Sequence, residues 1–327
     1  MAKRHCILVV IDPTSEDQPA LAKAAGFAEH IDADLALLTC IFDPDIAHVE
    51  WVTGDSLSHL RAAAIDEQFQ VLERLAEPLR GAGRTVSVKV AWDKPLHEAI
   101  IREALRLSPE FVVKDTHHHS ALSRALFTNT DWHLIRDCPS PLWLVKPTPV
   151  PENATVMAAI DPTHEHDQTA ALDHRIIQTA QLFAAMFEER LQLVHVIEPP
   201  PPMITGVFPA TAPATPALDP GLIEKAREAH VNALNTLAAD GGFPAEQVHL
   251  LDGHQVKVLP EAATELNANI VVMGAIARSA LERAIIGHTA EQTLDRFLCD
   301  VVVVKPADFK SPVESIPPIY GHDEKTG

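Results

Sequence analysis

The same strand-ending signature occurs twice in this chain. A β-branched run from His5 to Ile11 stops at Asp12-Pro13-Thr14, and a second run from Val156 to Ile160 stops at Asp161-Pro162-Thr163. After each copy, short apolar runs alternate with segments of helical periodicity. Strands separated by helices in this order form parallel sheets with helices on both faces. The sequence therefore predicts one α/β unit built twice, with any ligand crevice at the carboxyl ends of the strands.

Each unit is predicted to contain five strands. They are His5–Ile11, Asp34–Phe42, Thr85–Trp92, Phe111–Val113 and Leu142–Val145 in the first unit, and Val156–Ile160, Leu191–Ile197, Val248–Leu251, Ile270–Met273 and Val301–Val304 in the second. The fold class expected is two tandem Rossmann-like α/β units, each a five-stranded parallel sheet with helices on both faces. We expect the last strands of the two units to pair, which makes the chain an intramolecular pseudo-dimer. Whether two chains form a homodimer stays open.

The repeat also sets the expected boundaries. Both units close on Val-Lys-Pro, at residues 145–147 and 304–306, so we place the first unit at 1–150, the second at 151–309 and a polar tail at 310–327. The tail is expected to have little structure of its own. The second unit is about ten residues longer, and the Pro-rich segment at about 198–220 supplies them. This segment is interpreted as a flexible insertion rather than as a lid over the second crevice.

Charge and composition exclude several classes of partner. The 327 residues carry 26 Lys and Arg against 45 Asp and Glu, a formal net charge of −19. Nucleic acid and anionic membranes need basic surface, so we expect neither as a partner. No apolar run approaches the roughly 18 residues that span a bilayer, and the first one stops at Asp12-Pro13, too early for a signal peptide. The four widely spaced cysteines are expected to be reduced thiols of a cytoplasmic protein.

The fourth strand of the second unit leads into the best candidate ligand site. Val271-Val272-Met273-Gly274 is followed by a loop of small residues, and Gly287-His288-Thr289-Ala290-Glu291 then opens a predicted helix. Backbone amides at a helix N-terminus bind phosphate readily. A strand that delivers the chain to such amides predicts an anion site at this point.

The duplicated Asp-Pro-Thr start, this small-residue loop and the Gly-x-Thr-Ala-Glu helix opening resemble the universal stress protein family. Further likeness lies in Trp132 and its neighbours, in residues 138–146 and in residues 306–314, and it is nearest to the tandem members. The resemblance implies an adenine nucleotide α-hydrolase-like fold. ATP-binding members carry Gly-x-x-Gly, nine residues, and then Gly followed by Ser or Thr. Here Gly274 and Gly287 match, whereas Ala277 replaces the second glycine and His288 stands at the Ser or Thr position.

The resemblance also implies a ligand, ATP with Mg²⁺ or a related nucleotide, and a set of contacts in the second unit. Asp161 would approach the adenine edge, within Asp161-Pro162-Thr163, and Val196 would line the base. The ribose and phosphates would be surrounded by Met273, Gly274, Ala277, Arg278, Gly287, His288 and Thr289. In the first unit the matching positions hold Asp115, His118, His119 and Thr128. Both glycines are lost and a carboxylate lies where a phosphate would approach, so the first unit is not expected to bind ATP in the family manner.

One further cluster is a candidate metal site. Asp115-Thr116-His117-His118-His119 contains metal-ligand side chains, with His133 as a conceivable addition, but adjacent loop residues rarely converge on one ion, and a polar loop is the preferred interpretation. No metal site and no catalytic pair is therefore assigned. The resulting hypothesis is a non-enzymatic stress-response protein that binds a nucleotide in its second unit. The alternatives are a slow ATPase or nucleotide-state switch, and a binder of a non-nucleotide anionic or lipid-like ligand.

Overall fold

The computed structural model describes residues 5–46, 58–116, 128–163, 170–187, 190–199, 220–275, 293–316 and 319–320. The first half of the chain contains β1 (Cys6–Val10), α1 (Pro19–His30), β2 (Asp34–Ile41), α3 (Ser58–Gly81), β3 (Val86–Trp92), α4 (Leu96–Leu107), β4 (Phe111–Asp115), α5 (Asn129–Asp137) and β5 (Leu142–Val145). Strands and helices alternate as the apolar periodicity predicts. Most predicted boundaries lie within two residues of the observed ones.

The second half repeats this order. Its elements are β6 (Thr155–Ala159), α6 (Ala170–Ala184), β7 (Leu191–Ile197), α7 (Pro220–Asp240), a short 3₁₀ turn (Ala245–Gln247), β8 (Val248–Asp252), α8 (Gln255–Glu265), β9 (Ala268–Gly274) and β10 (Asp300–Val304), and the short strand β11 (Ile319–Tyr320) follows. The helix predicted from Gly287 to Leu298 lies mostly outside the described residues. The insertion predicted at about 198–220 lies outside them as well, except at its two ends.

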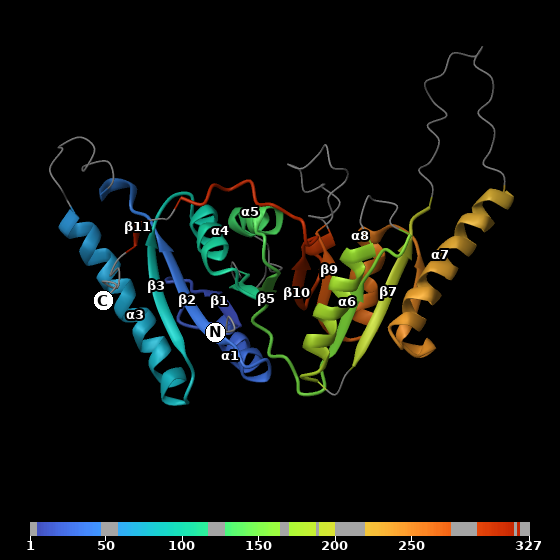
Figure 1. Ribbon diagram of the computed structural model, residues 1–327, viewed down its shortest axis with the longest axis horizontal. Coiled ribbons are helices and arrows are strands. Elements are labelled where there is room, and N and C mark those ends of the chain that lie inside the picture. The colour runs from blue at the N-terminus through green and yellow to red at the C-terminus, as the bar shows by residue number, and fades with distance from the viewer. Residues whose placement is uncertain are drawn as a thin grey trace, which may run out of the picture.

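All described strands join one sheet in the order β11-β3-β2-β1-β4-β5-β10-β9-β6-β7-β8 (Figure 1). Within each half the five strands are parallel. Helices cover both faces: α1, α3, α6 and α7 pack on one buried cluster, and α4, α5 and α8 pack on the other. The predicted fold class of two tandem Rossmann-like units, each with a five-stranded parallel sheet, is confirmed.

The two halves meet through β5 and β10, the strands expected to pair, and the structure shows that they pair antiparallel. Trp143 lies opposite Val302, and these two residues occupy the same position in their respective halves, 159 residues apart. Their neighbours pair reciprocally, Leu144 with Val301 and Leu142 with Val303. Such reciprocal pairing is what a two-fold dimer interface produces. The tandem chain therefore reproduces an isologous contact inside one polypeptide.

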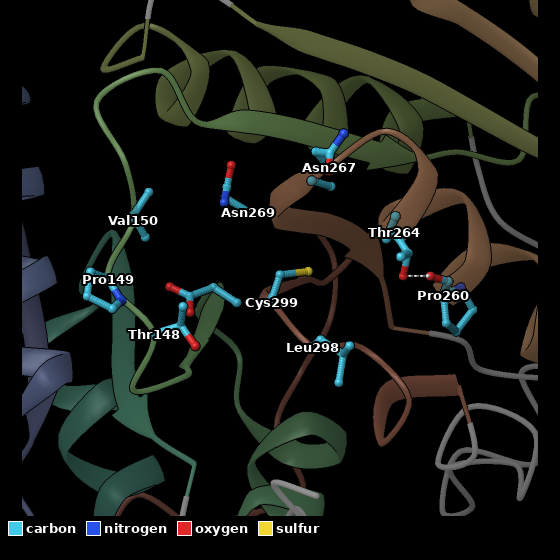
Figure 2. A pocket seen from close by; sticks show the side chains of 12 residues that line it. Thr148, Pro149, Val150, Pro260, Thr264, Asn267, Asn269, Leu298 and Cys299 are labelled. Carbon is cyan, nitrogen blue, oxygen red and sulfur yellow. Dashed lines mark hydrogen bonds between the residues drawn. The ribbon is translucent and has the colours of Figure 1, made fainter.

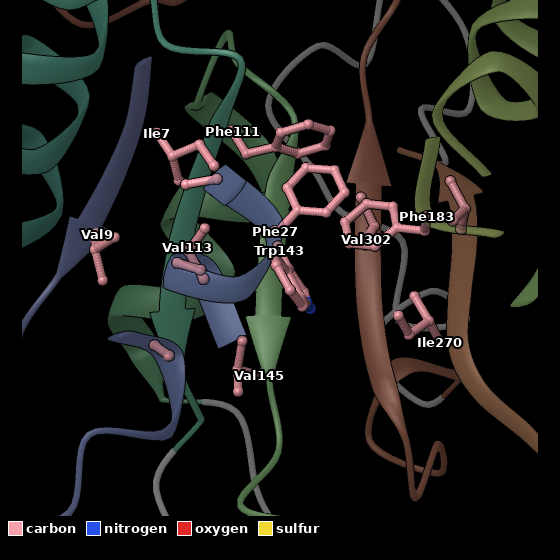
Figure 3. Packing of buried hydrophobic residues seen from close by; sticks show 14 of the residues in the cluster. Ile7, Val9, Phe27, Phe111, Val113, Trp143, Val145, Phe183, Ile270 and Val302 are labelled. Carbon is pink, nitrogen blue, oxygen red and sulfur yellow. The ribbon is translucent and has the colours of Figure 1, made fainter. Parts of the chain in front are cut away.

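An aromatic cluster lies under this junction (Figure 3). Phe27 of α1 and Phe183 of α6 stack with ring centroids 4.4 Å apart, and Trp143 meets Phe183 edge-on at 4.8 Å. All three side chains are almost fully buried. Aromatic rings bury large apolar areas and add directional contacts, so this cluster joins the helical layers of the two halves into one core.

A buried carboxylate joins the same halves without a symmetric counterpart. Asp300, at the start of β10, is 1% exposed and accepts hydrogen bonds from Lys23 Nζ at 2.8 Å, from Trp143 Nε1 at 3.0 Å and from the Lys146 amide at 2.8 Å. All three donors belong to the first half or its closing segment. The matching position in the first half is Pro141, which offers no acceptor side chain. Burial raises the pKa of Asp300, against the opposing effect of Lys23.

The C-terminal segment corrects one expectation. Little structure was predicted after residue 310, but β11 pairs antiparallel with β3, at the far edge of the first half (Figure 1). The Tyr320 hydroxyl donates to Glu103 at 2.6 Å, and Lys89 Nζ lies 3.5 Å from the Tyr320 ring centroid. Val313 packs against the cluster beneath α4 and α5. The pairing of β11 could not be predicted from this polar, Pro-containing sequence, because a single aromatic side chain, Tyr320, makes the main contact.

Candidate functional site

The topology places one crevice in each unit at the same point. The chain runs from β1 to β2 on one side and later places β4 on the other side of β1, and β6, β7 and β9 repeat this arrangement. In open parallel sheets such a reversal opens a crevice outside the carboxyl ends of the two central strands. In the second unit this crevice lies where Asp161 follows β6 and Gly274 ends β9. Two predicted site residues from distant parts of the chain therefore meet at one sheet edge.

The loop after β6 is held by three hydrogen bonds. The Ile160 carbonyl oxygen lies 3.1 Å from His195 Nδ1, and the Asp161 amide donates to Asp173 Oδ1 at 3.0 Å. Thr163 Oγ1 donates to Asp161 Oδ1 at 2.9 Å. The other carboxylate oxygen of Asp161, Oδ2, is buried and has no hydrogen-bond partner within the described part of the chain. A buried acceptor without a donor is costly, so this atom suits a ligand that brings an N–H group.

The remaining predicted contacts divide into two groups. Val196 and Met273 are 4% and 3% exposed and belong to the same buried cluster, so the strand positions expected beside a base lie on one face of the sheet. Beyond Gly274, the Ala275 amide donates to the Val304 carbonyl at 2.9 Å, which extends the pairing of β9 with β10. Ala277, Arg278, Gly287, His288 and Thr289 lie outside the described residues, and the phosphate end of the site stays a prediction.

In the first unit, the chain's own carboxylates occupy the equivalent crevice. Asp115 ends β4 and accepts a hydrogen bond at 2.8 Å from the Ala20 amide, in the first turn of α1. Burial raises the pKa of Asp115 to about 6, even though the Ala20 amide and two lysines favour the ionised form. Asp115 thus holds the first turn of α1 through this hydrogen bond, while burial makes its ionised form unfavourable.

A second carboxylate closes the N-terminus of α5. Asp131 is fully buried, its Oδ1 lies 2.9 Å from Lys114 Nζ, and its Oδ2 accepts from the Thr128 amide at 2.7 Å. The Asp131 amide in turn donates to Thr128 Oγ1 at 3.2 Å, which completes a capping box. The backbone amides at this helix end are thus capped by side chains of the same helix, and Lys114 balances the negative charge of Asp131.

The second unit lacks both carboxylates at these positions. By the 159-residue spacing, Asp115 corresponds to Gly274, Asp131 to Ala290 and Lys114 to Met273. Burial supports this correspondence, because Leu134, Ile135 and Cys138 match Thr293, Leu294 and Phe297, and all six are nearly or fully buried. At these two aligned positions, therefore, the second unit has no carboxylate that would compete with an external anion.

The sequence alone did not mark several of these residues as part of a site. Thr128 and Asp131 have the spacing of a capping box, so the α5 cap could have been recognised. Lys114 could not be assigned to Asp131, because their contact depends on how α5 packs against β4. The same holds for Asp173, and for His195 and His230, whose ring nitrogens lie 2.8 Å apart across 35 residues.

The candidate metal cluster receives no support from its described members. His133 stacks on His97 with ring centroids 3.8 Å apart, and its Nδ1 lies 2.5 Å from an Arg136 nitrogen. Asp115 is engaged by α1, and His117, His118 and His119 lie outside the described residues. Within the ranges that the structure covers, no group of three or more His, Cys, Asp or Glu side chains is arranged to hold a metal ion.

A pocket of about 240 Å³ lies at the opposite edge of the sheet (Figure 2). Thr148, Pro149 and Val150 of the connecting segment form one wall, and Asn269 and Cys299 lie near the amino ends of β9 and β10. The pocket is therefore separate from the crevice at Asp161 and Gly274. Burial raises the pKa of the Cys299 thiol to about 12, which keeps it protonated and weakly nucleophilic at neutral pH.

The fold and the crevice define a tandem Rossmann-like α/β protein. The model of the universal stress protein family matches residues 3–146 and 153–305. Universal stress protein E of Salmonella typhi is 32% identical over 319 residues, which cover 96% of this chain and 98% of that protein. The corresponding protein of Escherichia coli strain K12 is 31% identical over the same length and the same shares. This chain therefore belongs to the universal stress protein family, and it is similar over nearly its whole length to universal stress protein E.

Solved structures agree with this assignment. A Pseudomonas aeruginosa UCBPP-PA14 protein described as a universal stress protein superposes with a TM-score of 0.71 at 28% identity, over 93% of this chain and 94% of that one. A universal stress protein from Archaeoglobus fulgidus DSM 4304 shares the fold with a TM-score of 0.59 at 17% identity, over 93% and 97% of the two chains. Among the described helices, none is long and apolar enough to cross a membrane.

Proposed function

We propose that this protein is a non-enzymatic stress-response protein that binds one adenine nucleotide, ATP with Mg²⁺ or a close relative, in its second unit. The observation that carries the proposal is the contrast between the two crevices. In the first, Asp115 and Asp131 engage the N-termini of α1 and α5. In the second, the matching positions hold Gly274 and Ala290, whose side chains carry no negative charge. A helix N-terminus favours an external phosphate where the chain places no carboxylate of its own at these positions.

The base end of the second crevice supports a nucleotide rather than a simple anion. Asp161 Oδ2 is a buried acceptor without a donor among the described residues, and an adenine edge carries N–H donors that suit it. Val196 and Met273 offer an apolar wall on the same face of the sheet, of the kind that a base packs against. An inorganic phosphate would use neither feature.

Calorimetry on the full chain tests the proposal. Protein freed of co-purified nucleotide is titrated with ATP and MgCl₂, and saturable heat is expected with no steady turnover of ATP. The variant Gly287→Trp should abolish the heat, because the indole would fill the space next to the helix opening. No heat at millimolar ATP, and no nucleotide in protein as isolated, would refute the proposal. A different co-purified mass in native mass spectrometry would then favour a non-nucleotide ligand, whereas steady turnover lost in Gly287→Trp would favour the slow ATPase.

A further inference from the structure

Two buried histidines connect helix α7 to the loop that carries Asp161. His195 of β7 and His230 of α7 are 2% and 4% exposed, and His195 Nε2 lies 2.8 Å from His230 Nδ1. On its other side, His195 Nδ1 lies 3.1 Å from the carbonyl oxygen of Ile160, the residue before Asp161. The contacts form one continuous path from α7 through both rings to the end of β6.

The partners fix which ring nitrogens carry protons. The Ile160 carbonyl can only accept, so His195 Nδ1 is the donor in that bond. In a neutral His195 ring, Nε2 is then an acceptor, and His230 Nδ1 must donate to it. Each ring therefore has a defined tautomer, and rotation of either imidazole breaks the path. A hydrogen-bonded pair of this kind holds its two backbone elements at a fixed spacing.

The first unit lacks this connection at the same place. Thr39 occupies the position of His195, and its hydroxyl donates to the Ile11 carbonyl at 3.2 Å, next to Asp12. Gln68 occupies the position of His230, because the buried pairs Leu72 and Ala76 in α3 and Leu234 and Ala238 in α7 follow at the same spacing. Yet Gln68 Oε1 has no hydrogen-bond partner in the part of the chain that the structure describes. The carbonyl bond is present in both units, whereas the histidine path to the long helix is found in the second.

We propose that His195 and His230 are positioning residues for the base end of the nucleotide site, an inference that rests on the proposed function. They hold the Ile160 carbonyl, and with it Asp161, at a fixed distance from α7, while Asp173 holds the Asp161 amide from α6. Asp161 is then presented to the base without an ordering cost at the moment of binding. The same hydrogen bonds link the base end of the site to α7, which begins at Pro220.

The first unit supplies the test variants. His195→Thr copies Thr39, so it keeps a hydroxyl donor for Ile160 and removes the link to α7. His230→Leu removes the link from the other side, and His230→Gln copies Gln68 but retains an amide that can donate to His195. We expect ATP affinity to fall about tenfold in His195→Thr and in His230→Leu, and to stay within about threefold of wild type in His230→Gln. Thr39→Val and Gln68→Leu in the first unit are the matched controls and should bind ATP as wild type does.

A second measurement needs no variant. In nitrogen-15 NMR of the wild-type chain, both rings should show the tautomer with the proton on Nδ1, and saturating ATP should shift the His195, His230 and Asp161 signals together. Wild-type affinity in His195→Thr and His230→Leu, an equal loss in His230→Gln, or ring signals that do not respond to ATP would each overturn the positioning role and leave the proposed function standing. If wild type binds no ATP, the proposed function fails and this inference fails with it.

Discussion

The two units share one fold, but the residues aligned at the helix ends beside their crevices differ in charge. In the first, Asp115 and Asp131 face the N-termini of α1 and α5, and Lys114 neutralises Asp131. In the second, Gly274, Ala290 and Met273 stand at those positions. A helix N-terminus favours negative charge whether it comes from the chain or from a ligand. The comparison shows that the first unit places carboxylates of its own at helix ends where the second unit has Gly274 and Ala290 at the aligned positions.

The junction between the units shows a second asymmetry. The pairing of β5 with β10 is two-fold, and so is the stacking of Phe27 on Phe183. The Asp300 carboxylate, by contrast, binds Lys23, Trp143 and the Lys146 amide, and Pro141 stands at its symmetric position. In a two-fold dimer of separate, identical chains, such a contact would have to occur twice. The tandem arrangement allows it, because each half can then change alone.

The largest effect is expected from the asymmetric carboxylate at the junction. Asp300→Ala removes the acceptor of the buried Trp143 N–H and leaves the Lys23 ammonium with the Lys146 carbonyl but no carboxylate, and breaking a buried pair of this kind costs about 3–5 kcal/mol. Urea denaturation of the full chain measures the loss. Glu29→Ala, which removes an exposed partner of Arg84, is the control and should leave the midpoint unchanged. A loss below about 1 kcal/mol in Asp300→Ala would show that the symmetric contacts alone hold the junction.

Introducing into the second crevice a carboxylate like that of the first should weaken ligand binding there. Ala290→Asp places at the second helix opening the group that Asp131 provides in the first, and its charge opposes the phosphates. We expect ATP affinity to fall about 30-fold, or about 2 kcal/mol. Ala290→Asn adds similar bulk without charge and should stay within about threefold of wild type. Equal losses in the two variants, measured by calorimetry, would show that volume rather than charge separates the crevices.

The internal carboxylate at β4 makes the first unit sensitive to pH. The pKa of Asp115 is raised from 3.8 to about 6 by burial, so its contribution to stability is complete below about pH 4 and is lost as the pH rises through 6. Asp115→Asn keeps an acceptor for the Ala20 amide and removes the charge. It should stabilise the chain by about 1–2 kcal/mol at pH 7.5 and by much less at pH 4. Thermal unfolding at both pH values checks this, and a difference independent of pH would contradict it.

The smallest effect concerns the α5 cap itself. Thr128→Ala removes the hydroxyl that accepts from the Asp131 amide, and the loss of such a cap costs about 1 kcal/mol. Thr128→Ser retains the hydroxyl and should behave as wild type in urea denaturation. If serine destabilises as much as alanine, the methyl packing of Thr128 matters more than the cap, and the first crevice is less dependent on its internal anion.

The fold was largely predictable from the sequence, and the site only in part. Repeated Asp-Pro-Thr and Val-Lys-Pro segments fix the register of the two units, and periodicity then places the strands. The pairing of β5 with β10 was expected because a duplicated unit can keep a dimer contact inside one chain. The Ile319–Tyr320 strand was missed because two residues carry no periodicity. At the site, motif spacing predicted a ligand contact at Gly274 and its altered counterpart at Asp115. It could not identify Lys114 with Asp131, or His195 with His230, because these contacts depend on how helices pack over strands.

The stoichiometry of ATP binding tests the contrast between the units most directly. Equilibrium titration of the full chain with ATP and Mg²⁺ should give one site per chain. Gly287→Trp should abolish binding, and Thr128→Trp, the same change at the matching position of the first unit, should leave the stoichiometry at one. Two sites per chain, or binding that is lost in Thr128→Trp and kept in Gly287→Trp, would contradict the assignment of the ligand to the second unit.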